Sequence, residues 1–431
     1  MALGEGAAVS PLQRGGTGGR WHGCMVLMGS GGAGGYGAGG RSRFRREAVS
    51  FVRLSADELD RLTPSSRDRY VDFVRAFSIV VVVVGHWTIA LVFWQDGSIF
   101  VHNVVGHQSG LWLATWVLQV MPLFFFVGGF SNAKGWGPPT TRKITYRRFM
   151  AKRLSRLLRP TIVFVGVWIG VEIALHVFDI GSDGVFRGTF LPFWPLWFLA
   201  VYVVVVALTP VTLRWHRRWG LGVIMVLVGA IAVVEVLRFG FGVGWVGWLN
   251  LLTVWVTIHQ IGYFYADKSL LNAGPAVWWA MVGAGITGLI ALTNLDLVTG
   301  ELWYPRSMVG VDIEPVSNMS PPSLAIVALA CWQIGAAMLL RTPLSRWLAK
   351  PAPWAGVVYV NSIIMTVFLW HLTALVIAIV VLHPVGFGQD TTPTLRWWAE
   401  RIIWIAAPAT ILAILVAIFG RFEQPKTTRP T

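Results

Sequence analysis

One apolar segment carries side chains whose types and spacing suit chemistry. The stretch RDRYVDFVRAFSIVVVVVGHW, residues 67–87, places Asp72, Arg75 and His86 around a run of valines. Eleven residues separate Arg75 from His86, which in an α-helix is about three full turns, so both point from one face, roughly 16 Å apart along the axis. Asp72 is three residues before Arg75 and is placed to pair with it. A neutral imidazole with a pKa of about 6.5 suits a general base.

A packing explanation stands beside this one. Arg75 near a helix end can extend its guanidinium to the membrane interface, and His86 can make a single hydrogen bond to another helix. Ionisable groups inside membrane segments are more often functional, and the shared face of the two residues favours a site.

Composition decides what kind of element positions these residues. The chain has 431 residues, of which 55% are hydrophobic and 13% charged, whereas about a quarter of the residues of soluble domains are charged. The 24 tryptophans are typical of membrane interfaces. We therefore predict an all-α, polytopic integral membrane protein.

Ten segments are apolar and long enough to cross about 30 Å of hydrocarbon. They are residues 71–94, 110–130, 160–178, 191–211, 219–238, 244–266, 274–293, 322–341, 357–382 and 400–419. Residues 1–66 form a Gly- and Arg-rich extension, predicted to be largely disordered, with a possible short surface helix at about 50–66. The transmembrane domain covers 67–420, and 421–431 form a tail.

The excess of positive charge follows the predicted loops. The connection 131–159 holds nine basic residues and no acidic one, and further arginines fall on the same side of alternating helices. The positive-inside rule places this side and both termini in the cytoplasm. The formal charge of +15 is thus explained by topology and does not indicate a nucleic-acid partner.

Several motifs together resemble the acyltransferase-3 family of integral membrane O-acyltransferases. RAFSIVVVVVGH contains the Arg-x10-His pattern of the first helix, MPLFFFVGGF follows in the second, and KRLSRLLRP matches an Arg-x-x-Arg element before a proline. FLWH in the ninth segment is also similar, and the resemblance covers roughly 67–420. Glycine-, alanine-, valine- and arginine-rich usage resembles that of high-GC bacteria and favours an actinobacterial type of member.

The resemblance implies an enzyme that moves an acyl group, usually acetyl, from cytoplasmic acyl-CoA to a hydroxyl of a cell-envelope glycolipid or carbohydrate. A mycolate-bearing glycolipid is one such acceptor, and the enzyme would lie in the bacterial plasma membrane without a permanently bound cofactor. Arg153 and Arg156 fill the Arg-x-x-Arg positions and share a helix face, where guanidinium forks suit the phosphates of CoA. His86 would be the base, Arg75 would hold the donor, and Asp72 would orient Arg75.

Other polar residues in apolar segments give weaker signals. His371, with Asn361 ten residues earlier, is a candidate for the acceptor site or a packing hydrogen bond, and Glu172 is a weaker substrate-binding candidate. Neither cysteine spacing suits a metal ion.

The same residues also fit two other functions. A flippase or transporter of an anionic or polyprenyl-linked envelope lipid would use the same basic face. A different membrane acyltransferase fold would place the chemistry on Asn361 and His371.

Overall fold

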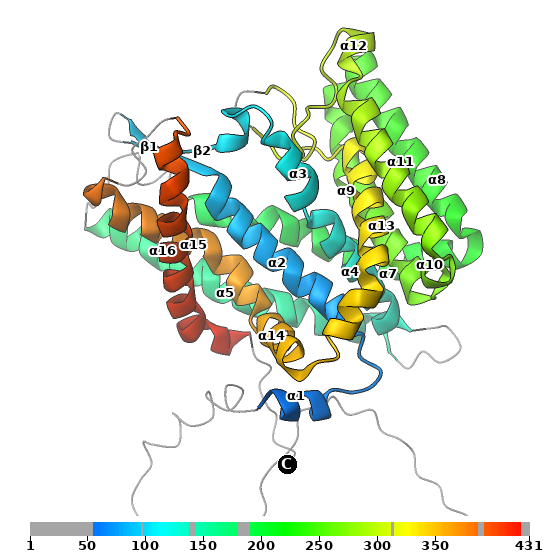
Figure 1. Ribbon diagram of the computed structural model, residues 1–431, viewed down its shortest axis with the longest axis horizontal. Helices are drawn as coiled ribbons and strands as arrows, with labels where there is room; N and C mark the ends of the chain where they lie inside the picture. Colours follow the sequence, from blue (N-terminus) through cyan, green and yellow to red (C-terminus); the bar gives the residue numbers. More distant parts are fainter. Residues whose placement is uncertain are drawn as a thin grey trace, which may run out of the picture. The chain divides into compact units, whose positions relative to one another are not determined.

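The computed structural model describes residues 55–95, 98–137, 144–178, 190–311, 314–386 and 392–423. Within these ranges the chain is mostly helical, and nine helices are long and apolar enough to cross a membrane (Figure 1). The predicted all-α integral membrane class is confirmed. Most of the predicted amino-terminal extension and of the carboxyl-terminal tail lies outside the described residues.

α-Helices make up most of the described residues. They are α1 (Ala56–Leu62), α2 (Arg69–Ile89), α3 (Trp112–Leu118), α4 (Met121–Trp136), α5 (Tyr146–Val177), α7 (Leu196–Trp219), α8 (Leu221–Glu235), α9 (Asn250–Ala266), α10 (Ser269–Asn272), α11 (Pro275–Thr293), α12 (Asp296–Thr299), α13 (Leu324–Trp347), α14 (Pro351–Ser362), α15 (Ile364–Leu382) and α16 (Leu395–Phe419). Short 3-10 or π turns occupy Val104–Gly106, Leu191–Phe193, Val236–Gly240, Gly244–Leu249, His383–Val385 and Gly420–Phe422.

The first predicted span is shorter than expected and leads into a hairpin. Helix α2 ends at Ile89 rather than near 94, and strands β1 (Ala90–Gln95) and β2 (Ser98–Asn103) follow as an antiparallel pair. The β-branched and aromatic residues of this part of the sequence favour extended backbone as well as apolar helix. Hydropathy alone does not separate the two.

Two other predicted spans differ in the structure. The segment 244–266 begins with a 3-10 turn, and its α-helix, α9, has only 17 residues, most of them buried. Segment 357–382 is divided into α14 and α15. The break at Ile363 therefore places Asn361 and His371 on different helices, which a continuous apolar pattern does not reveal.

The basic connection predicted at 131–159 is also largely helical. Helix α5 begins at Tyr146, where the Thr145 side chain accepts a hydrogen bond from the Arg148 amide. Lysine and arginine are good helix formers, so the charged residues extend this helix to 32 residues. Arg153 and Arg156 consequently lie on the same rigid element as the apolar residues that follow them.

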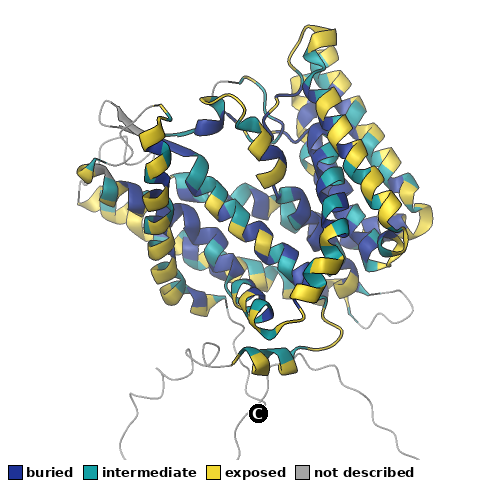
Figure 2. Cartoon of the chain, viewed as in Figure 1, coloured by how far each residue is buried: buried dark blue, intermediate teal, exposed yellow. Residues whose placement is uncertain are grey.

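The core is built around α4 and α9, which pack along each other. A Cβ atom at Gly129 would lie 2.0 Å from the His259 carbonyl oxygen, and one at Gly262 would lie 2.2 Å from that of Phe126. Glycine at both positions lets the two helix backbones approach closely, as is common between membrane helices. Exposed side chains instead cover the outward faces of α8, α11 and α16 (Figure 2).

Helix α2 packs against α4, α14, α15 and α16 (Figure 1). The face that carries Arg75 and His86 is therefore turned toward other helices, while Phe77, Val80 and Val84 on the opposite face are exposed. This arrangement decides which residues of α4 and α15 meet the candidate site.

Candidate functional site

Near the carboxyl end of α2, the site consists of a pair of histidines, one from α2 and one from α15. His86 Nδ1 lies 2.8 Å from His371 Nε2, and His371 Nδ1 lies 2.6 Å from the carbonyl oxygen of Phe368. The indole of Trp87 donates to the carbonyl oxygen of His371 at 3.0 Å. His371 is fully buried, whereas His86 is only partly buried. His86 and Trp87 of α2 thus both contact His371 of α15, the first at its ring and the second at its backbone carbonyl.

These contacts fix where the protons of a neutral pair lie. A carbonyl oxygen only accepts, so His371 Nδ1 must carry a hydrogen and donate it to Phe368. His371 Nε2 then has a lone pair and accepts from His86 Nδ1–H. His86 Nε2 is left with a lone pair that is not used in this chain of hydrogen bonds. The geometry therefore sets His86, rather than His371, as the group able to take a proton.

Near the amino end of α2, the site consists of a group of arginines around Ser131 on α4. The Arg75 guanidinium contacts Asp72 Oδ1 at 3.0 Å and donates to the Ser131 hydroxyl at 2.7 Å. Arg153 donates to the Ser131 carbonyl oxygen, also at 2.7 Å. The pairing of Asp72 with Arg75 predicted from their spacing is present. One small residue thus joins arginines from α2 and α5.

The same region has more positive than negative charge. Arg156 lies close enough to Arg75 and Arg153 for their charges to repel each other. Asp72 also contacts Arg67 at 2.5 Å, and Glu423 interacts with Arg156. Four arginines thus face two carboxylates, an excess of two positive charges. Such a cluster favours an anion with several oxygens, such as phosphate.

Glu423 also holds the end of the helix that carries His371. Its carboxylate accepts hydrogen bonds from the backbone amides of Met365 (3.0 Å) and Thr366 (2.9 Å) and from the Thr366 hydroxyl (2.9 Å). Burial raises the pKa of Glu423, against the effect of these hydrogen bonds, which favour its charged form. The first turn of α15 is therefore anchored by the segment that follows α16.

Asn361 and His371 meet opposite ends of α2. The Asn361 amide donates to the carbonyl oxygen of Asp72 at 2.9 Å, while His371 contacts His86. Fourteen residues of helix, about 21 Å, separate Asp72 from His86. This separation argues against a reaction centre formed by Asn361 and His371 together.

Glu172 lies near the end of α5 and is four residues before His176, with 4.0 Å between Glu172 Oε1 and His176 Nδ1. Its side chain is more than one-third exposed. The contacts of Glu172 within the described residues give no link to the histidine pair.

A family comparison bears on what this arrangement does. A family model described as an acyltransferase domain matches residues 68–422, a range that includes both parts of the site. The chain belongs to the acyltransferase-3 family. No curated protein and no solved structure matches the chain.

The candidate site of this membrane acyltransferase contains contacts that the sequence did not indicate. Ser131 follows the recognisable FVGGF motif but is an ordinary helix residue by composition. The Trp87 indole reaches the His371 carbonyl only because α2 and α15 pack together, whereas the Phe368 carbonyl lies three residues before His371 on the same helix. Among the described residues, no group of three or more metal-binding side chains occurs.

Proposed function

We propose that this acyltransferase moves a short acyl group, acetyl in the first place, from cytoplasmic acyl-CoA to a hydroxyl group of the bacterial cell envelope. The observation that carries the proposal is the hydrogen-bond chain from the Phe368 carbonyl through His371 to His86. It leaves a lone pair on Nε2 of His86, a residue that is partly rather than fully buried. A positioned base of this kind is what attack by a hydroxyl on a thioester requires.

His86 acts as the general base of this reaction. His86 Nε2 takes the proton of the acceptor hydroxyl as its oxygen attacks the thioester carbonyl carbon. The carbon–sulfur bond then breaks, and the departing thiolate takes the proton from His86. The products are the ester and free CoA. His371 touches no reacting atom and acts as a positioning residue that holds His86 in the required tautomer.

The arginine cluster supports a donor that enters from the cytoplasmic side. Arg75, Arg153 and Arg156 offer guanidinium groups to the phosphates of CoA, and Ser131 and Asp72 hold Arg75 in place. Arg75 and His86 are about 16 Å apart along α2. The donor is thus bound at its charged end, and its thioester arm extends along α2 toward His86.

The proposed acceptor is a glycolipid or carbohydrate hydroxyl, with a mycolate-bearing glycolipid as the first candidate. The support for it is the family resemblance together with the high-GC composition. We place the enzyme in the plasma membrane, with its arginine cluster in the cytoplasm, because the basic connections fall on that side.

Radiolabelled acetyl-CoA tests the reaction and its sidedness together. Membrane vesicles that contain the protein are prepared inside-out and right-side-out, and label is followed into solvent-extracted lipid and into water-soluble glycan. CoA does not cross the bilayer, so label transfer and release of free CoA are expected in inside-out vesicles only. The fraction that becomes labelled identifies the acceptor class.

Two results would contradict the proposal. Labelling in right-side-out vesicles alone would place the donor site on the wrong face. Transbilayer movement of an anionic envelope lipid, without release of CoA in either preparation, would favour a flippase.

A further inference from the structure

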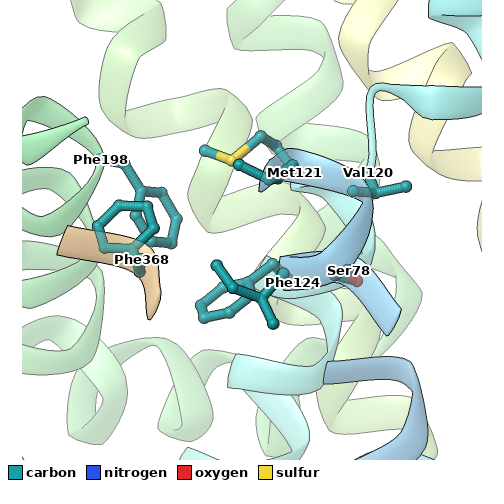
Figure 3. A pocket seen from close by; sticks show the side chains of 8 residues that line it. Ser78, Val120, Met121, Phe124, Phe198 and Phe368 are labelled. Carbon is teal, nitrogen blue, oxygen red and sulfur yellow. The ribbon is translucent and has the colours of Figure 1, made fainter. Parts of the chain in front are cut away.

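A small apolar cavity (Figure 3) lies beside the part of α2 between Arg75 and His86, because Ser78 and Val82 of that helix line it. It has room for about one water molecule. Its lining comes from α2, α4, α7 and α15 and includes Ser78, Val82, Met121, Phe124, Phe198 and Phe368.

This cavity lies one helical turn from the proposed base along α2. Val82 lies one helical turn before His86, about 6 Å along α2, on the face that also carries Arg75. Phe368 lies one turn before His371, and its carbonyl accepts the hydrogen bond that fixes the histidine pair. A group bound here is therefore within one turn of both histidines.

The cavity wall offers no free polar partner. Ser78 has the only polar side chain among the lining residues, and its hydroxyl donates to the Val74 carbonyl oxygen at 2.8 Å. Phe124 and Phe198 meet edge to face, with ring centroids 5.0 Å apart, and Phe198 meets Phe368 in the same way at 5.5 Å. Figure 3 shows Phe198 and Phe368 on one side of the space and Phe124 with Met121 on the other.

We infer that this cavity is the acyl pocket, the site that receives the alkyl end of the donor's acyl group and restricts it to about two carbons. The thioester arm of CoA contains two amides, which would lose hydrogen bonds to water in an apolar space without partners. A methyl group loses none, and it is about the size of the single water molecule that the pocket accommodates. The inference rests on the proposed function and names the residues that select the acyl group.

Donor preference tests the acyl pocket. Protein in lipid nanodiscs is given acetyl-, propionyl- and butyryl-CoA with the acceptor fraction identified by labelling, and kcat/KM is measured for each donor. The wild type should prefer acetyl-CoA, with a loss of about 10-fold or more for each added carbon. Phe124→Ala should raise kcat/KM for butyryl-CoA relative to acetyl-CoA by at least about 10-fold. Phe164→Ala, which removes the same atoms from a buried site outside the pocket, should leave the ratio unchanged.

A filling substitution provides a second measure that does not depend on a cavity-forming variant. Val82→Ile adds one carbon to the pocket wall and should lower kcat/KM for acetyl-CoA about 10-fold. Val84→Ile makes the same change on the exposed face of α2 and should have no effect.

Equal use of acetyl- and butyryl-CoA by the wild type would overturn the acyl pocket. So would an unchanged donor ratio in Phe124→Ala, which would identify the space as part of the arm's path or as a packing void. Failure of the wild type to use any acyl-CoA would instead overturn the proposed function, and the pocket with it.

Discussion

The two ends of the functional face of α2 are built in different ways. At one end, His86 and His371 form a single directed contact that a backbone carbonyl completes. At the other end, arginines from α2 and α5 lie around Ser131 and outnumber the carboxylates near them. The histidine end depends on the position of individual lone pairs, and the arginine end depends on the number of positive charges.

The two ends of the site should therefore respond differently to substitution. A directed proton transfer is lost when one atom is removed or turned, because no neighbour supplies the same lone pair. In a cluster of cations, every charge attracts the same anion, so the loss of one hydrogen bond leaves most of the attraction in place. Substitutions at the histidine end should lower kcat, and those at the arginine end should raise KM for the donor.

The largest effect is expected for His86→Ala. Removing the base should lower kcat about 10²- to 10⁴-fold, with KM for acetyl-CoA changed by less than about threefold, because the arginines still hold the donor. The rate at which free CoA is released from acetyl-CoA measures this loss of turnover. His176→Ala, at the far end of α5, serves as the control with normal turnover. Full turnover in His86→Ala would remove His86 from the mechanism.

Substitution of His371 tests whether it orients His86. His371→Ala should lower kcat by up to about 10²-fold, since His86 loses the partner that fixes its tautomer and ring position. His371→Gln keeps an oxygen that can accept from His86 Nδ1–H and should retain more activity than the alanine variant. A larger change in the acceptor KM than in kcat would instead indicate a direct acceptor contact.

At the arginine end, we expect an effect on donor affinity. Arg153→Ala combined with Arg156→Ala should raise KM for acetyl-CoA at least about 10-fold, because charge-assisted hydrogen bonds are worth about 1.5–3 kcal/mol each. The double variant Arg147→Ala with Arg148→Ala removes the same charge from exposed positions of the same helix. An equal rise in that control would reduce the role of Arg153 and Arg156 to general surface charge.

The smallest effect is predicted for Ser131→Ala. This change removes the hydroxyl that contacts Arg75 but keeps the carbonyl that contacts Arg153. KM for acetyl-CoA should rise only about two- to fivefold, because Asp72 still holds Arg75 and Ser131 acts on the donor only through Arg75, with kcat unchanged. A fall in kcat without a change in KM would show that Arg75 acts at the reacting atoms rather than on donor binding.

Much of the fold was open to prediction because apolar length and loop charge are properties of sequence alone. The class, the helical setting of Arg75 and His86, and the pairing of Asp72 with Arg75 all follow from spacing along one helix. Predictions failed where local pattern is ambiguous. Hydropathy extended α2 through residues that form a hairpin, and it joined α14 to α15 across the break at Ile363.

The sequence by itself determined that this protein is helical and membrane-embedded, and its motifs placed it in an acyltransferase family and singled out Arg75, His86, Arg153 and Arg156. These are facts of composition, period and motif, which need no partner from elsewhere in the chain. Only the tertiary structure decided that Ser131 joins two arginines, that Asn361 lies at the opposite end of α2 from His371, and that His371 directs the lone pair of His86. The physical reason is that hydrogen bonds between helices depend on rotation and depth, and contacts between residues 285 positions apart leave no periodic trace in the sequence.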